Sequence, residues 1–138
     1  MMHVAGLPLL AVLLAVPAAA QDVPRHFPLD KSYKAVSIGG RDVQNAGITF
    51  KVASDPSGHV RGSGRAGCNR WTASTMIGEN AIHFSAIVTT KMFCGEPRMT
   101  DENAFLGALQ SARTWRSEGA RLIVEGESAQ LVLTADPA

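Results

Sequence analysis

The sequence is poor in the groups that most catalytic sites require. It contains only two cysteines, Cys68 and Cys94, and these lack the Cys-x-x-Cys spacing that most redox pairs have. Neither a Gly-x-Ser-x-Gly nucleophile elbow nor a His-Glu-x-x-His zinc motif occurs anywhere in the chain. These absences disfavour catalysis, and we expect a protein that is not an enzyme and that needs no cofactor.

Aromatic side chains and excess charge are also scarce. Aromatic residues make up 6% of the chain, and 13 basic against 12 acidic residues leave a net charge of +1. A balanced charge gives no electrostatic reason to expect DNA, RNA or an anionic membrane as partner. Few rings also argue against a stacking platform for bases or sugars. We therefore expect no nucleic-acid partner.

One long apolar run, Leu7 to Val16, stands near the N-terminus and is interrupted only by Pro8. The small residues Ala18-Ala19-Ala20 follow it, so residues 1–20 are predicted to be a signal peptide, although the first three residues contain no Lys or Arg. The run is shorter than the roughly 20 residues that span a bilayer. No cysteine stands just after this run, so lipid attachment is not expected. We expect a periplasmic or secreted protein without a membrane anchor.

The remainder of the chain has the size of one domain, which can bury about two thirds of its unfolded surface around a single core. Residues 21–32 include Pro24 and Pro28 and predict an extended lead-in. Residues 33–135 are predicted to form the domain, and a monomer is expected.

Short strands with hairpin-length connections dominate this region. Ile48, Phe50 and Val52 alternate with more polar residues, a period typical of a half-buried strand. Asp55-Pro56-Ser57-Gly58 has the composition of a turn and predicts a hairpin. Other strand-like segments are predicted at 32–38, 71–77, 81–84, 88–92, 113–116, 121–125 and 130–134.

A single helix is predicted over Pro97 to Ala112, where apolar residues from Phe105 onward recur at helical spacing. Thr100 is the predicted N-cap, and Asp101 and Glu102 lie in the first turn, where the helix dipole favours negative charge. The fold class is therefore α+β and mostly β. We expect a curled antiparallel sheet or a small, partly open barrel, with the helix covering one face or an open end.

The two cysteines favour a disulfide, because an exported domain folds in an oxidising compartment. Closing the loop between them would contribute on the order of 3–4 kcal/mol in the chain-entropy model. Two free buried thiols and a redox pair are the alternatives.

Two motifs surround the cysteines: Gly67-Cys68-Asn69-Arg70 followed by an aromatic residue, and Thr90-Lys91-Met92-x-Cys94. An Asp-Glu-Asn-Ala-Phe helix and two closing strands follow. In this order the motifs resemble the META domain family, that of the bacterial heat-shock protein HslJ, over roughly residues 33–133. Two local departures are the absence of a glycine soon after Trp71 and Ser85-Ala86-Ile87 in place of a Gly-Pro-Leu segment. The motif residues are Gly67, Cys68, Asn69, Arg70, Thr90, Lys91, Met92 and Cys94.

The resemblance implies a compact, mostly β domain of exported bacterial and some protozoan proteins, associated with envelope or heat stress and with no shared reaction. The expected function is therefore that of a non-enzymatic exported protein that acts in stress through binding or protection. Its partner would be an unknown protein or small molecule. One alternative is a carrier of a small apolar ligand, held inside the curled sheet around Phe50, Ile82, Phe84 and Leu131. Another is a protein-inhibitor or secretion-pilot module, which needs an exposed loop or an apolar groove.

Asn69 and Arg70 are the candidate recognition residues, because an amide and a guanidinium can hold a carboxylate or phosphate. The competing structural interpretation is stronger: Asn69 bonds local backbone, and Arg70 satisfies a sheet edge or stacks on Trp71. The segment Gly62 to Gly67 matches Gly-x-Gly-x-x-Gly, but no helix follows it, so these glycines are expected to form a bulge or a corner.

Other candidates have simpler interpretations. His59 and His83, expected on strands, could hold zinc with a cysteine, but no two of these residues have short ligand spacing, so surface histidines are favoured. Asp101 and Glu102 point about 100° apart on a helix and are interpreted as dipole partners rather than an acid/base pair. Trp115 is expected in the core or at its rim.

Overall fold

The structure is a computed structural model of the chain, and it describes residues 2–15 and 26–136. The predicted Ala18-Ala19-Ala20 cleavage triplet and residues 21–25 of the predicted lead-in lie outside the described residues. Residues 2–15 form no helix or strand, and their side chains are exposed. Within the two described ranges, no helix has the length and apolar character that crossing a bilayer requires.

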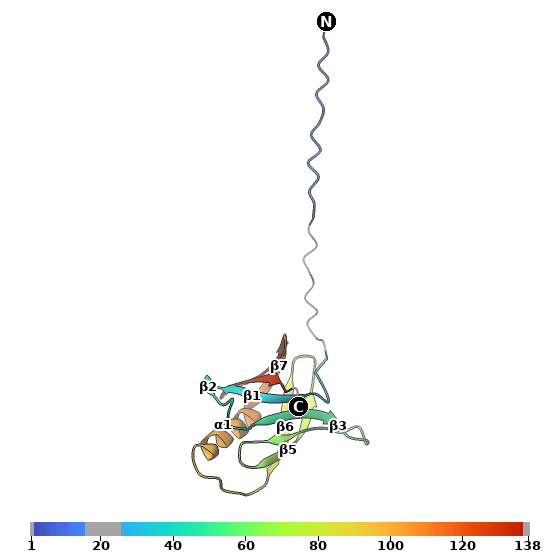
Figure 1. The fold of residues 1–138 in the computed structure, drawn as a ribbon. Coiled ribbons are helices and arrows are strands. Elements are labelled where there is room, and N and C mark those ends of the chain that lie inside the picture. Colours follow the sequence, from blue (N-terminus) through green and yellow to red (C-terminus); the bar gives the residue numbers. More distant parts are fainter. Residues whose placement is uncertain (1, 16–25, 137–138) are drawn as a thin grey trace.

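The folded domain consists of antiparallel strands and one helix (Figure 1). The strands are β1 (Ser32–Ile38), β2 (Arg41–Asp42), β3 (Thr49–Ser54), β4 (Val60–Arg65), β5 (Arg70–Ile77), β6 (Ile82–Thr89), β7 (Ala112–Glu118), β8 (Arg121–Gly126) and β9 (Gln130–Ala135). The helix is α1 (Arg98–Ser111). The predicted hairpin around the Asp55 turn is confirmed, since β3 and β4 pair from Lys51↔Ser63 to Ser54↔Val60.

The sheet has the strand order β6-β5-β4-β3-β1-β9-β8-β7, with β2 attached to β1. Its two edges meet at one point: Ala81 and Thr114 form a bridge, and the Trp115 amide donates to the Asn80 carbonyl at 3.0 Å. The sheet therefore curls into a partly open barrel, and α1 lies against strands from both of its halves. The predicted fold class is confirmed.

Aromatic side chains from the sheet and the helix meet inside the barrel. Trp71 packs against Phe50, Phe84 and Phe105 with ring centroids 5.5–6.2 Å apart. The alternation predicted for the strand around Phe50 is confirmed, because its apolar residues are buried and Lys51 is exposed. Phe27, in the predicted lead-in, also joins the core, where its ring lies 5.2 Å from that of Trp115.

Two local predictions are wrong. Residues 88–92 do not form a strand of their own, because β6 continues to Thr89 past a bulge at Ala86, where φ is 49°. The bulge breaks the alternation and divides one strand into two apparent segments. Thr100 is not the N-cap: α1 begins at Arg98, and the Glu96 carboxylate accepts bonds from both the amide and the hydroxyl of Thr100.

Of the two alternatives expected for the glycines at 62–67, a bulge or a corner, the bulge is absent, and the glycines of β4 serve close packing. The β4–β5 register runs without a shift from Arg61 to Arg65. A Cβ on Gly62 would lie 2.9 Å from the Trp71 ring, and one on Gly64 would lie 2.2 Å from the Thr49 carbonyl oxygen. Only Gly67, with φ +118°, turns the chain at the predicted corner.

Gly107 offers a contrast, because it lies within α1 and a Cβ there would meet nothing within 4 Å. Gly107→Ala should raise the free energy of unfolding by about 0.5–1 kcal/mol, since alanine removes the entropy cost of a helical glycine. Urea denaturation of the two proteins measures this. Loss of stability in the variant would contradict the position assigned to this residue.

Candidate functional site

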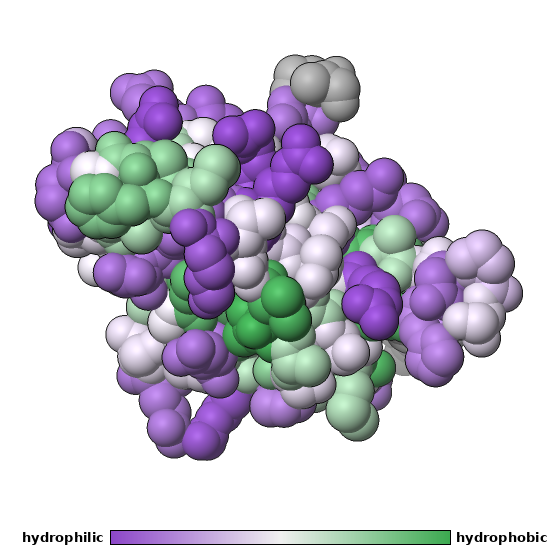
Figure 2. All heavy atoms as spheres, turned by 90° about the horizontal axis from the view of Figure 1, so that it is seen from below, coloured by the Kyte–Doolittle hydropathy of each residue, from purple (hydrophilic) through white to green (hydrophobic). Residues whose placement is uncertain are grey.

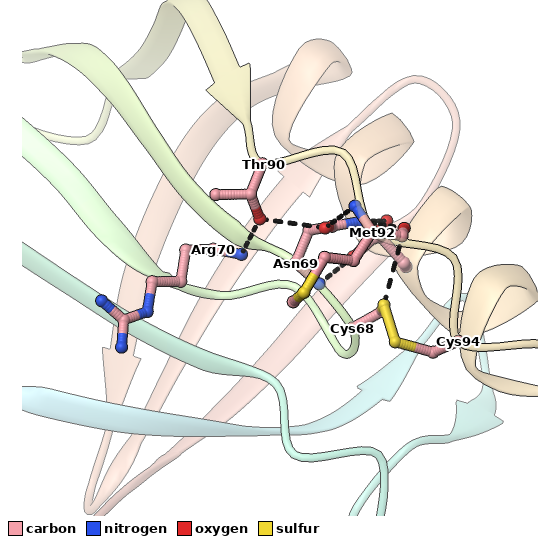
Figure 3. Close-up of a disulfide and its surroundings, with 7 residues drawn as sticks. Cys68, Asn69, Arg70, Thr90, Met92 and Cys94 are labelled. Atoms are coloured by element: carbon pink, nitrogen blue, oxygen red, sulfur yellow. Dashed lines mark hydrogen bonds between the residues drawn. A yellow bond between two sulfur atoms is a disulfide. The ribbon is translucent and has the colours of Figure 1, made fainter.

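A disulfide joins the corner after β4 to the segment that follows β6. Cys68 and Cys94 are bonded, with Cα atoms 5.8 Å apart, which confirms the predicted pair. Cys68 is buried and Cys94 exposed, so the bond links the core to a surface loop. In Figure 3 the Cys68 sulfur also faces the Met92 carbonyl oxygen at 3.6 Å. A disulfide sulfur carries no proton, so this approach is a packing contact.

Asn69 holds the same loop without covalent bonds. Its amide oxygen accepts from the Met92 backbone N–H at 2.7 Å and from the Thr90 hydroxyl at 2.9 Å. Its amide nitrogen donates to the Met92 carbonyl at 3.0 Å and to a Glu102 carboxylate oxygen at 2.8 Å. The two predicted motifs are therefore in direct contact, through one side chain that is 3% exposed.

Glu102 fixes the corner to the helix. Its other carboxylate oxygen accepts from the Asn69 backbone N–H at 2.7 Å, and the side chain is buried. Asp101 beside it accepts from the Arg41 guanidinium at 2.8 Å. Asp101 lies in the first turn as predicted, whereas Glu102 follows that turn, because α1 begins at Arg98. Each binds a distant segment, so a role limited to the helix dipole does not describe them.

The sequence contains a pattern that indicates a buried, bonded Glu102. Asp101 and Glu102 stand four and three positions before Phe105, which places both on the buried stripe of the helix. A carboxylate on such a stripe needs a partner, because burying it alone is costly. The sequence does not identify that partner, since Asn69 is 33 positions away.

Arg70 faces the opposite way from Asn69. Its side chain is exposed and points away from the disulfide and the amide network (Figure 3). It does not stack on Trp71, because neighbours on a strand point to opposite faces and the Trp71 ring lies in the core. Recognition by Asn69 and Arg70 stays a prediction, but the amide of Asn69 is already used within the protein, which leaves Arg70 open to solvent.

The remaining candidates are separate from this corner. His59 lies in the turn rather than on a strand, with its ring nitrogen 2.8 Å from the Ser57 hydroxyl, and His83 is exposed on β6. The disulfide leaves neither cysteine free as a thiolate. Among the described residues, no three potential metal ligands lie together. Trp115 is a core residue, and its indole donates to the Gly78 carbonyl at 3.1 Å.

The tethered loop presents apolar groups to solvent. Met92 is 56% and Phe93 81% exposed, although the backbone on either side is held by Asn69 and Cys94. Figure 2 shows the molecule from below relative to Figure 1, the side toward which this loop extends, and green apolar groups lie there among purple polar ones. Met92 and Phe93 therefore form a small exposed apolar surface on a loop whose backbone is held in place.

Comparison with known proteins places this corner in context. The family model described as "META domain" matches residues 27–138. A solved structure of a protein from Burkholderia xenovorans is similar at 20% identity, with a TM-score of 0.65 over 90% of this chain and 99% of that chain. A DUF4847 family protein from Bacteroides vulgatus is similar at 13% identity, with a TM-score of 0.51 over 78% of this chain and 94% of that chain. These structures share the fold. A search of curated protein sequences finds no match.

Proposed function

The chain belongs to the META domain family, and from that membership we propose that it is an exported, non-enzymatic protein that binds and protects other proteins during envelope or heat stress. Its site of contact is the loop between Thr90 and Gly95. The disulfide is compatible with the oxidising compartment that export would provide. No nucleic acid is expected as partner.

The observation that carries the proposal is the exposure of Phe93 on a loop fixed at both sides. An apolar side chain on a mobile loop can fold back onto the protein. This loop is held by the disulfide and by three hydrogen bonds that join the Asn69 side chain to Met92 and Thr90. A pre-ordered apolar anchor loses little entropy on binding, which favours an interface. The partner we expect is an apolar segment exposed on a partly unfolded protein.

The alternative of an internal carrier is less well supported. Phe50, Ile82, Phe84 and Leu131, the residues expected to line its pocket, are all at most 3% exposed. The Phe50 and Phe84 rings lie 5.9 Å apart and both contact Trp71, so packed side chains occupy this space. The inhibitor or secretion-pilot alternative would use the same exposed loop and differs only in the partner.

Phe93→Ala should weaken protection of a denatured protein by about tenfold or more in concentration, as truncating a central aromatic anchor does at interfaces. Stability should change by less than about 0.5 kcal/mol, because the ring is exposed. Light scattering of an aggregating, chemically denatured protein measures the first quantity, and thermal unfolding measures the second.

Met76→Ala is the matched control, since Met76 is 70% exposed on β5, outside the loop. It should protect like the parent protein. Equal protection by the parent and the Phe93 variant would reject the loop as the contact. Recovery of the full-length chain, beginning at Met1, in the cytoplasmic fraction would reject export.

A further inference from the structure

A second surface lies on the outer face of β4 and β5, where two cross-strand pairs stand side by side. Arg65 is the partner of Arg70, and Ser63 is the partner of Thr72. Positions two apart on a strand share a face, so all four side chains leave the sheet on the same side. Directly opposite residues have Cβ atoms about 4.5–5.5 Å apart. Two guanidinium groups and two hydroxyl groups therefore share one small area.

The four residues surround a hollow in the surface. It has a volume of about 370 Å³ and is lined by them together with Gly64 and Trp71, mostly through their carbon atoms. The base of the hollow is paired strand backbone, where Gly64 lies opposite Trp71, and the Trp71 ring is buried on the inner side of the sheet.

None of these donors is used inside the protein. In residues 2–15 and 26–136, neither guanidinium has an ion-pair or hydrogen-bond partner, and neither the Ser63 nor the Thr72 hydroxyl makes a hydrogen bond. The five ion pairs that these ranges contain all involve other residues: Arg41–Asp101, His59–Asp55, Arg113–Glu127, Arg116–Glu118 and Arg116–Glu125.

An arginine directly opposite another arginine is unfavourable in a sheet, because like charges at this position repel. Further positive charge surrounds the pair. Lys51 on β3 is the partner of Ser63, and Arg61 precedes Ser63 by two positions on the same face. The net charge of +1 hides this local excess, because the acidic residues lie mainly in turns, α1 and the closing strands. Repulsion of this kind would be relieved by a bound anion.

We propose that Arg65, Arg70, Ser63 and Thr72 form a binding site for a phosphoryl group. Arginine forks match phosphate oxygens in bidentate geometry, and hydroxyl groups add neutral donors. A tetrahedral phosphoryl group presents its oxygens in different directions to two forks, which the two coplanar oxygens of a carboxylate do not. The hollow is open to solvent, so it admits free phosphate or the phosphate of a lipid headgroup. This site does not use Phe93, although the Arg70 backbone is hydrogen-bonded to Thr90, where the loop begins.

Titration of the isotope-labelled protein with inorganic phosphate, followed by amide NMR shifts, tests the site. Shifts should concentrate at residues 63–65 and 70–72 and diminish as sodium chloride is added, because an exposed ion contact is screened by salt. Arg65→Gln/Arg70→Gln should weaken binding by at least about tenfold, and Arg65→Lys/Arg70→Lys by less, because charge is kept while the forks are lost.

Arg98→Gln/Arg121→Gln is the matched control, since it removes two exposed arginines elsewhere on the domain, and it should bind like the parent. The Arg65→Gln/Arg70→Gln variant should also melt at a higher temperature than the parent at low salt, because the like-charge repulsion is removed. This melting measurement also tests whether the variant folds. Co-sedimentation with phosphatidylglycerol vesicles that depends on Arg65 and Arg70 would assign the phosphate to a headgroup, and binding of inorganic phosphate alone would assign it to the free ion.

The proposal is overturned if phosphate causes no amide shifts at residues 63–72 and the protein does not sediment with the vesicles. It is also overturned if the Arg65→Gln/Arg70→Gln variant binds as well as the parent. The Phe93→Ala variant should bind phosphate as the parent does, and the Arg65→Gln/Arg70→Gln variant should protect denatured protein as the parent does. Failure of one proposal is therefore distinguishable from failure of the other.

Discussion

Asn69→Ala should lower the free energy of unfolding by about 3–5 kcal/mol, the range found when one member of a buried network with a charged partner is removed. The substitution deletes all four hydrogen bonds of the amide. It leaves a Glu102 oxygen and the Met92 backbone groups without their partners inside the protein. Urea denaturation followed by fluorescence of Trp71 and Trp115 measures the loss.

Asn69→Asp should be at least as damaging, although it keeps the shape of the side chain. Its carboxylate would lie against the Glu102 carboxylate, where the structure has a donor 2.8 Å away. Asn103→Ala is the matched control, because Asn103 is exposed on α1 and alanine favours helix. If Asn69→Ala changed stability as little as Asn103→Ala, the network would contribute nothing to the fold.

The Cys68→Ala/Cys94→Ala variant should lose about 3.5 kcal/mol, which is the chain-entropy value for a crosslink of this span, the cysteines being 26 positions apart. The urea dependence of its unfolding free energy should also steepen, because the denatured chain without the crosslink exposes more surface. Parallel urea titrations of the two proteins give both quantities.

Reduction of the parent protein provides the control. The parent in reductant should match the double variant, and the variant itself should not respond to reductant. A loss below about 1 kcal/mol would mean that Asn69 alone orders the loop and that the crosslink contributes little through the denatured state. Mass analysis under non-reducing conditions should show the parent two hydrogens lighter than its reduced form.

Most of the strand pattern was predictable, because strands such as β3 and β5 alternate buried and exposed residues. The alternation around Phe50 and the turn after Ser54 are local properties, and both appear in the structure. The predictions that failed depend on distant atoms. The bulge at Ala86 breaks an alternation, and the glycines at 62 and 64 are required by Trp71 and Thr49 on neighbouring strands.

Of the candidate site, only the pairing of Cys68 with Cys94 could be predicted from the sequence. With only two cysteines, each has one possible partner within the chain, so the sequence identifies the candidate pair, and the structure decides that the two are bonded. The partners of Asn69 were not predictable, because a side-chain amide can bond any nearby donor or acceptor. Its choice of Met92, Thr90 and Glu102 depends on where three separate segments meet.

The sequence by itself determined the family resemblance, the mostly β composition and the candidate cysteine pair, because periodicity and residue chemistry act over short range. Only the tertiary structure decided which side chains of the Gly67–Arg70 corner are buried and which are exposed. It placed Asn69 inside, where its hydrogen-bonding groups are satisfied by the protein, and Arg70 outside, opposite Arg65. The physical reason is that Arg70 begins β5 on the outer face of the sheet, whereas Asn69 lies in the corner before the strand and is bonded to Glu102 on α1. Closure of the barrel decides which side of the sheet becomes the core.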